Sequence, residues 1–229
     1  MKIVAPKSRL ARWELGRCTS ENDTDYIYVP LPKCASRYTM QILNYMCGWT
    51  ETGNFLLNKE LSEKKKIVVV RDPLTRWMSG IVHHFHLQEI DIVDENVPYI
   101  FNQLALDPHT ELQVKYLEGL DTDQCVFFLL DDTYKDKLKH FIVNVLNKNY
   151  TFWNKSGEDN LYSGSASSEK NKLLWHNSTD SKPHKKQNLI QLKKRIDMNP
   201  EYLQKVQKYL EPDYAFIRSL EFYKGDMDV

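Results

Sequence analysis

The sequence predicts an α/β protein in which a parallel sheet is flanked by helices. Apolar, β-prone runs lie at residues 26–31, 66–70 and 125–130, and a turn and a helical pattern follow each of them. Strands that alternate with helices in this way form parallel sheets. The length of 229 residues fits one domain that spans 1–229 and is sufficient for a single buried core.

The first unit runs from a strand at residues 26–31 into a helix. Pro32 ends the strand, because proline cannot donate to a sheet ladder. Apolar residues then recur at helical spacing over 37–47, and Gly48 is suited to end that helix. Ser36 stands where an N-cap residue is expected.

The turn between this strand and helix is rich in hydrogen-bond donors. Lys33, Ser36 and Arg37 add side-chain donors at a helix N-terminus, which carries about half a positive charge and N–H groups without intrahelical partners. Together they predict a phosphate-binding turn. The alternative is an ordinary strand-to-helix connection with a capping serine, and the local pattern alone does not decide between the two.

The second unit repeats this arrangement. Residues 66–70 form a continuous apolar run, typical of a buried parallel strand, and Arg71 follows directly. Asp72 and Pro73 then provide an N-cap and a first-turn proline for a helix over 73–88. The apolar side chains of that helix cluster on one face. The opposite, polar flank carries Arg76, Ser79, His83 and His86.

The secondary structure of the other segments is predicted from the same kinds of pattern. Residues 1–24 are expected to be irregular, and residues 49–66 to form a connection. Asp131 or Asp132 is expected to cap the helix after the third strand. Further helices are predicted at 99–106, 111–117, 185–196, 200–210 and 212–222. The Ser, Asn, Lys and Gly residues of 154–184 predict a long mobile loop.

With both units in view, the chain resembles the sulfotransferases that use 3′-phosphoadenosine 5′-phosphosulfate (PAPS). Residues 32–36, Pro-Lys-Cys-Ala-Ser, are similar to the family's 5′-phosphosulfate loop, usually Pro-Lys-x-Gly-(Ser/Thr)-(Ser/Thr), and the alanine variant resembles the heparan sulfate 2-O-sulfotransferase branch. Residues 71–80, Arg-Asp-Pro-Leu-Thr-Arg-Trp-Met-Ser-Gly, resemble the 3′-phosphate element, Arg-(Asp/Asn)-Pro-x-x-Arg-x-x-Ser. Fainter similarity covers most of the chain.

The resemblance implies a P-loop-like, nucleotide-binding sulfotransferase fold. It also implies an enzyme that transfers a sulfuryl group from PAPS to an acceptor hydroxyl, of a carbohydrate rather than of a small phenol. Lys33 would be catalytic, because it would neutralise and protonate the departing phosphate. The residues that would bind the nucleotide are Lys33, Cys34, Ala35, Ser36, Arg37, Tyr38, Arg71, Ser79, His176 and Asn177.

These residues divide into three groups. The first group, Lys33 and residues 34–38, would surround the 5′-phosphate, and Arg71 with Ser79 would hold the 3′-phosphate. His176 and Asn177 belong to a basic segment that either closes over the nucleotide or is merely solvated. Without the motif, Ser79 would be read as a solvent-facing helical serine.

The chain departs from the family pattern at two positions. Arg37 stands where a second Ser or Thr is usual. The family takes its catalytic base, a His or Glu, from between the two motifs, but residues 40–66 contain no His and Asn54 occupies the expected position. Glu51 is the leading candidate for the base. The alternatives are Glu60, His83 and His86, and each candidate is otherwise a solvated surface residue.

Composition limits the partners and the compartment. Lys and Arg balance Asp and Glu at 31 each, so no global field favours nucleic acid or a membrane surface. Four cysteines without a Cys-x-x-Cys pair indicate free thiols in a reducing compartment, and no apolar run reaches the roughly 20 residues of a membrane span. We therefore expect a cytoplasmic protein, or one of the Golgi lumen if the chain belongs to a longer, anchored protein.

Other functions agree less well with the sequence motifs. A nucleotide kinase should show Gly-x-x-x-x-Gly-Lys-(Ser/Thr), whereas this turn contains no glycine and its lysine comes first. A zinc site is disfavoured because His83 and His86 lack the His-Glu-x-x-His pattern, and sulfuryl transfer requires no metal. The remaining alternative is a non-catalytic protein that binds a nucleotide or a sulfated glycan and lacks the base.

Overall fold

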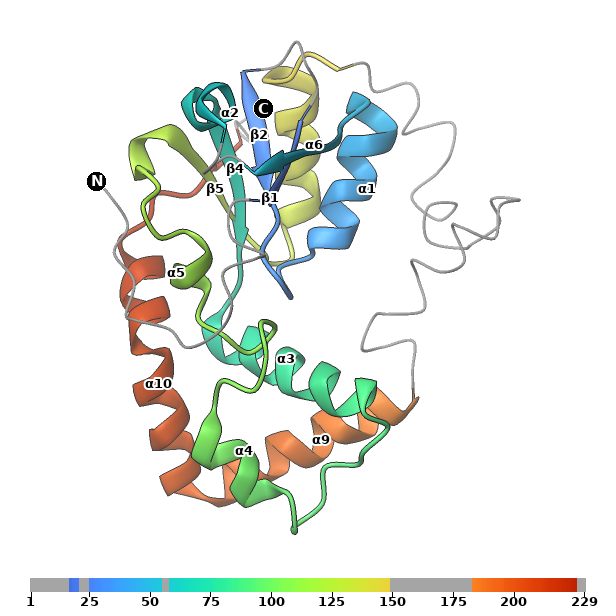
Figure 1. Cartoon of the computed structure of the whole chain (residues 1–229), viewed down its shortest axis with the longest axis vertical. Helices are drawn as coiled ribbons and strands as arrows, with labels where there is room; N and C mark the ends of the chain where they lie inside the picture. Colours follow the sequence, from blue (N-terminus) through green and yellow to red (C-terminus); the bar gives the residue numbers. More distant parts are fainter. Residues whose placement is uncertain (1–16, 21–24, 55–57, 149–182, 226–229) are drawn as a thin grey trace.

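The computed structural model describes residues 17–20, 25–54, 58–148 and 183–225. Its strands are β1 (Arg17–Ser20), β2 (Tyr26–Val29), β3 (Thr50–Asn54), β4 (Lys65–Val70) and β5 (Cys125–Leu129). Its helices are α1 (Ser36–Cys47), α2 (Lys59–Glu63), α3 (Pro73–Leu87), α4 (Val97–Gln103), α5 (Gln113–Tyr116), η2 (Thr122–Gln124), α6 (Tyr134–Asn144), α9 (Pro183–Met198) and α10 (Pro200–Arg218). These elements form an α/β protein, as the sequence predicts (Figure 1).

The five described strands form one sheet in the order β3-β1-β2-β4-β5. Strands β2, β4 and β5 are parallel, which confirms a small parallel sheet of three strands. Strand β1 runs antiparallel to both β2 and β3. The expectation of a plain connection over 49–66 is wrong, because β3 and α2 lie within it, and β1 lies in the region expected to be irregular.

The parallel strands are the apolar centre of the fold. Every residue over 67–70 of β4, the middle strand of the three, is 0% exposed. Such continuous burial is typical of a parallel strand that is covered on both faces. The register pairs Val29 with Val68 and Val70 with Leu129, so all three strands end at the same edge of the sheet.

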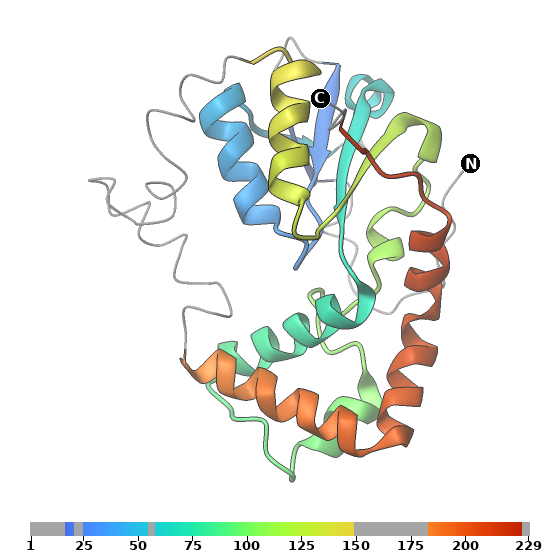
Figure 2. The same cartoon turned by 180° about the vertical axis from the view of Figure 1, so that it is seen from behind.

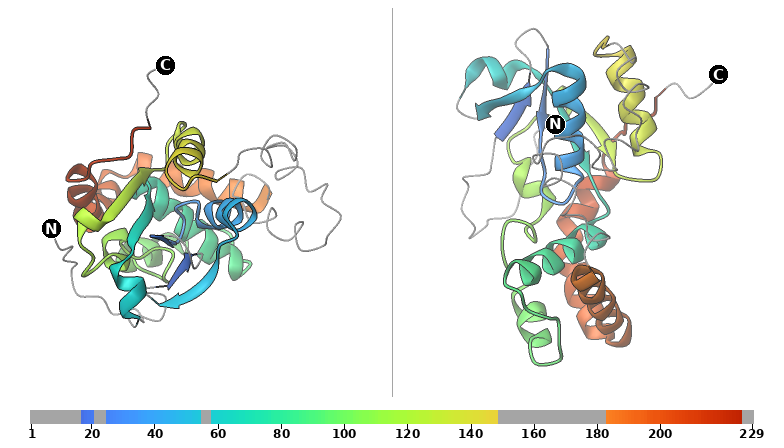
Figure 3. Two further views of the ribbon diagram at one scale, coloured as in Figure 1. Left: turned by 90° about the horizontal axis from the view of Figure 1, so that it is seen from above. Right: turned by 90° about the vertical axis from the view of Figure 1, so that its right-hand side faces the viewer.

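Two groups of helices lie around the sheet. Helices α1 and α6 lie side by side on one side of it, joined by a contact of 2.6 Å between Thr39 Oγ1 and the Tyr134 hydroxyl (Figures 1 and 2). Helices α3, α4 and α9 form a layer beyond the carboxyl ends of the parallel strands, and α10 rises from this layer past α5 (Figure 3). The two predicted phosphate turns therefore lie between the sheet and this helical layer.

Two predicted helix boundaries are wrong. Helix α6 begins one residue after Thr133, and Asp131 does not cap it but accepts a hydrogen bond from Thr133 N at 2.9 Å. Helix α10 continues through Pro212, so the two helices predicted at 200–210 and 212–222 are one. Interior proline disfavours a helix, but the buried Asp213 beside it accepts hydrogen bonds that hold α10 against α5.

The remaining boundaries agree more closely. Gly48 ends α1 in a left-handed conformation, and Asp72 caps α3 through a hydrogen bond of 2.8 Å from Thr75 N. Most of the predicted loop at 154–184 lies outside the described residues, which resume at Pro183. Within the described part of the chain, no helix combines the length and the apolar character that crossing a membrane requires.

Candidate functional site

The predicted phosphate-binding turn connects β2 to α1 at the carboxyl edge of the parallel strands. Lys33 and Ala35 have positive φ angles of 65° and 53°. Left-handed conformations disfavour non-glycine residues by about 1–2 kcal/mol each, and such strain concentrates at functional sites. The prediction that Ser36 caps α1 is wrong, because Ala35 takes the N-cap position and Ser36 is the first helical residue.

The second predicted turn meets the first one. Arg71, which follows β4, donates from Nη1 to Lys33 O at 3.4 Å. Gln113 connects the two turns by hydrogen bonds, a role that was not predicted from the sequence. Its Oε1 accepts from Arg71 N at 2.9 Å and from Cys34 Sγ at 3.2 Å, and its Nε2 donates to Arg71 O at 2.8 Å. The structure thus brings Lys33 and Arg71 together from successive strand ends.

Arg76 supports the turn from within the protein. Its side chain is 1% exposed, which corrects the expectation that it lies on the polar flank of its helix. Its Nε donates to Pro32 O at 2.9 Å, and its Nη1 donates to Glu111 O. Because its buried guanidinium binds the Pro32 carbonyl, Arg76 holds the turn between β2 and α1 against α3.

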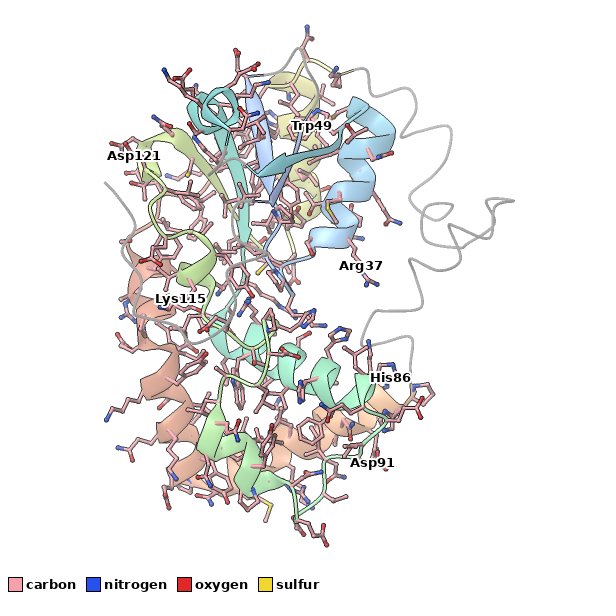
Figure 4. All side chains as sticks on the ribbon, in the orientation of Figure 1. Arg37, Trp49, His86, Asp91, Lys115 and Asp121 are labelled. Carbon is pink, nitrogen blue, oxygen red and sulfur yellow. The ribbon has the colours of Figure 1, made fainter. Side chains whose placement is uncertain are left out.

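Lys33 lies in a concentration of positive charge. Burial lowers the pKa of Lys33 to about 7, and the charges of Lys185, Arg37 and Arg71 act in the same direction, whereas Asp107 opposes them. We call Lys33, Arg37, Arg71 and Lys185 the cationic site. Figure 4 shows Arg37 at the end of α1 that faces the helical layer. An anion bound among these cations would offset their mutual repulsion.

Lys185 is a member of this site that the sequence did not predict. It lies on α9, is 1% exposed, and is close enough to lower the pKa of Lys33. The sequence signal was a basic run that includes Lys185 and Lys186, but Lys186 is exposed. Only the packing of α9 against α3 distinguishes the buried lysine from its neighbour.

Cys34 and Tyr38 direct their side chains into the protein. Burial raises the pKa of the Cys34 thiol to about 11, so this thiol stays protonated at neutral pH and is not a thiolate nucleophile. The ring of Tyr38 lies edge-on to that of Tyr134, with centroids 6.4 Å apart. Their predicted contribution to phosphate binding therefore concerns their backbone N–H groups.

Helix α3 carries the predicted Ser79 and two of the candidate bases. Helical spacing places Ser79 on the same face as His83, four residues later. Burial and the charge of Lys33 lower the pKa of His83 to about 3, so His83 lies near the cationic site. His86 lies one turn further, where its Nδ1 is 3.4 Å from Nδ1 of His184.

The other predicted residues lie elsewhere or outside the described chain. Glu51 belongs to β3, where its backbone pairs opposite Thr19, so strand β1 separates it from β2 and the phosphate turn. The alternative Glu60 is exposed on α2. His176 and Asn177 lie outside the described residues, and their predicted role is not tested.

The site thus combines two cationic turns with a buried lysine from α9 and the nearby His83 of α3. A comparison of the chain with protein families, curated proteins and solved structures finds no match. Function is therefore inferred from the residues of the site themselves.

Proposed function

We propose that the protein is a PAPS-dependent sulfotransferase with a P-loop-like sulfotransferase fold. One observation carries the proposal: the two motif turns meet at the carboxyl edge of the parallel strands, with Arg71 Nη1 3.4 Å from Lys33 O. Ligands of open α/β sheets bind outside this edge. The meeting of the two turns supports the proposal that both sequence motifs belong to one nucleotide site.

The cationic site suits a nucleotide with phosphates at two positions. The N-terminal N–H groups of α1, with Lys33 and Arg37, suit the 5′-phosphate. The guanidinium of Arg71 suits a terminal phosphate dianion, and Ser79 is proposed as its second donor. Burial is the largest cause of the lowered pKa of Lys33, and repulsion from Lys185, Arg37 and Arg71 adds to it. This repulsion supports an anionic ligand, because a bound anion would offset it.

Lys33 has the properties required for the leaving-group side of the reaction. PAPS supplies an activated sulfuryl group, whose transfer depends on positioning and charge stabilisation. With a pKa of about 7, Lys33 can both neutralise charge on a phosphate oxygen and give up a proton to it near neutral pH. The proposed acceptor is a carbohydrate hydroxyl, which is the acceptor class of the branch that the first motif resembles.

The proposal predicts selective stabilisation by 3′-phosphoadenosine 5′-phosphate. At a hundredfold excess over Kd, this bisphosphate should add about 2.7 kcal/mol to the free energy of unfolding. ATP should add much less, since it has no 3′-phosphate for Arg71 and Ser79. Thermal melting with each nucleotide measures the difference, and mass spectrometry of products after offering PAPS with a panel of glycans and small alcohols identifies the acceptor.

The matched control for this binding test is Arg71→Ala. It should reduce the affinity for the bisphosphate by about 1.5–3 kcal/mol, the range for a hydrogen bond to a charged group. It should leave the weaker effect of ATP nearly unchanged. Equal melting shifts with ATP and the bisphosphate in the wild-type protein would rule out the sulfotransferase proposal.

Binding of the bisphosphate should also take up protons near pH 8. Lys33, with a pKa of about 7, is mostly uncharged at that pH in the free protein, and a bound anion raises its pKa. Uptake should approach one proton, so affinity should fall by up to about tenfold per pH unit above pH 7. Calorimetry in two buffers of different ionisation enthalpy measures this uptake.

The variant that isolates this effect is Lys33→Met. His83 contributes nothing near pH 8, because its pKa is about 3 in the free protein. Loss of proton uptake in Lys33→Met would assign the uptake to Lys33. The same uptake in the variant and in the wild type would show that another group takes up the proton.

A further inference from the structure

A group of histidines and one carboxylate lies beside the cationic site. We call it the histidine cluster: it consists of His83 and His84 of α3 with Asp107 and His109 of the segment between α4 and α5. The rings of His83 and His109 meet edge to face, with centroids 4.5 Å apart. Asp107 lies 2.9 Å from His84 Nδ1 and 3.5 Å from His109 Nδ1.

A glycine allows this close packing. A Cβ atom at Gly80 would lie 2.3 Å from His109 O, far below any normal contact. The segment that carries His109 can therefore approach α3 only where the helix has no side chain. His83 lies on the next turn of α3, where it meets the His109 ring. Asp107 also accepts from His109 N at 2.7 Å, which fixes the segment further.

His83 is uncharged at neutral pH, although it lies close to an ionised carboxylate. Burial, followed by the charges of Lys33, His109 and Lys185, lowers the pKa of His83 to about 3, and Asp107 opposes them. Burial acts to raise the pKa of Asp107, but hydrogen bonds from His109 and His84 lower it to about 2. An uncharged imidazole beside Lys33 is able to accept a proton.

The ring of His83 is only partly buried, and one of its nitrogens is unpaired. Its Nδ1 is buried and has no hydrogen-bond partner among the described residues, and an unpaired buried polar group in a native fold calls for a functional explanation. We propose that His83 is the general base of the reaction and that its imidazole ring takes the proton of the acceptor hydroxyl. This inference rests on the proposed sulfotransferase function. It replaces Glu51 as the leading candidate for the base.

The step balances with Lys33 as the complementary acid. As the acceptor oxygen bonds to sulfur, its O–H bond breaks and the proton passes to His83. The bond between sulfur and the donor's phosphate oxygen breaks with its electron pair, and Lys33 protonates that oxygen. His109 is a positioning residue in this scheme, because its ring contacts His83 and its backbone is bound by Asp107.

Nucleotide binding should make His83 a stronger base. A bound anion offsets the charges of Lys33 and Lys185, which are two of the causes that lower the pKa of His83. Burial, which is the largest cause, and His109 still lower the pKa of His83, whereas the ionised Asp107 favours the imidazolium form. The base is therefore weak in the free protein and becomes effective when the phosphates of the donor are in place.

The first test needs no acceptor. Histidine NMR resonances are titrated with and without 3′-phosphoadenosine 5′-phosphate, and the His83 resonance is assigned by its loss in His83→Asn. The bisphosphate should raise the proton affinity of His83 by at least about tenfold. At constant pH, the chemical shift of the His140 resonance, on α6, should be the same with and without the bisphosphate. A His83 titration that is unchanged in protein saturated with the bisphosphate overturns the inference.

The second test compares two histidines of one helix with the glycan acceptor found by product mass spectrometry. His83→Asn should lower kcat by about 10²–10⁴-fold, as expected for loss of a general base, while bisphosphate affinity stays within about threefold. His86→Asn, one turn away, should keep kcat near the wild-type value. Stabilisation by the bisphosphate verifies that each variant is folded.

The outcomes separate this inference from the proposed function. Absence of bisphosphate binding in the wild-type protein contradicts the sulfotransferase proposal as a whole. Normal kcat in His83→Asn, in a protein that binds the bisphosphate and sulfates the glycan, overturns only the assignment of His83. Loss of kcat in His86→Asn but not in His83→Asn does the same and moves the base to His86.

Discussion

Replacing Lys33 with methionine should lower kcat about a hundredfold to a thousandfold, the usual effect of losing one donor to a developing oxyanion. Methionine keeps the length of the side chain and removes its charge. The affinity for 3′-phosphoadenosine 5′-phosphate should stay within roughly tenfold, because Arg71 and the N–H groups of α1 remain. Product formation from PAPS gives kcat, and calorimetry gives the affinity.

The same substitution should stabilise the free protein. The pKa of Lys33 falls from 10.5 to about 7 on folding, so between these values the unfolded chain holds a proton that the folded protein does not. Stability therefore rises with pH across this window, and the penalty from Lys33 is largest below pH 7. At pH 6, Lys33→Met should raise the free energy of unfolding by about 1–4 kcal/mol, measured by urea denaturation.

Lys186→Met is the matched control for both effects. Lys186 is an exposed lysine next to the buried Lys185, so its loss should change neither kcat nor stability appreciably. If turnover in Lys33→Met survives while the bisphosphate affinity collapses, Lys33 is only an anchor. The leaving-group role would then pass to another cation, with Arg37 first.

The parallel strands could be predicted from the sequence because each is an apolar run. Strand β4 is buried along 67–70, and its composition shows this directly. Strands β1 and β3 have the polar sequences Arg-Cys-Thr-Ser and Thr-Glu-Thr-Gly-Asn, which carry no such signal. They are strands because they pair with each other and with β2, and strand formation depends on such neighbours more than on local propensity.

The sequence likewise predicts only those residues of the candidate site that belong to local motifs. Lys33 and Arg71 could be predicted because each lies in a local motif at a strand end. Gln113 and Lys185 join them from distant parts of the chain, and only the packing of α5 and α9 brings them there. Among the candidate bases, Glu51 was placed first because it lies between the motifs, but His83, one of the alternatives, is the candidate that lies near Lys33.

The N-cap of α1 was predicted wrongly for a different, local reason. Ser36 has the composition of an N-cap, but the turn requires left-handed backbone at Lys33 and Ala35, which moves the helix start by one residue. The resembling family usually has glycine at the position of Ala35, and a positive φ of 53° is the backbone conformation that glycine adopts without strain. The left-handed backbone at Ala35, and not the capping preference of Ser36, therefore sets the start of α1.

Replacing Arg76 with methionine should have the opposite effect on stability from Lys33→Met. Arg76 is fully buried, binds the carbonyls of Pro32 and Glu111, and lies near the buried Asp213. Burial raises the pKa of Asp213, and the charge of Arg76 opposes that rise. Arg76→Met leaves these acceptors without their cation and should lower the free energy of unfolding by about 3–5 kcal/mol in urea denaturation.

The control is Arg218→Met on α10. Arg218 binds the carboxylate of Glu211 at 2.6 Å, but both side chains are exposed, so its loss should change stability by only about 0–1 kcal/mol. A small effect of Arg76→Met, similar to that of Arg218→Met, would show that the turn does not depend on this guanidinium. A large effect would show that Arg76, which has acceptors and acids around it, stabilises the fold. Lys33 differs from it, because burial and the nearby Lys185, Arg37 and Arg71 disfavour its charged form.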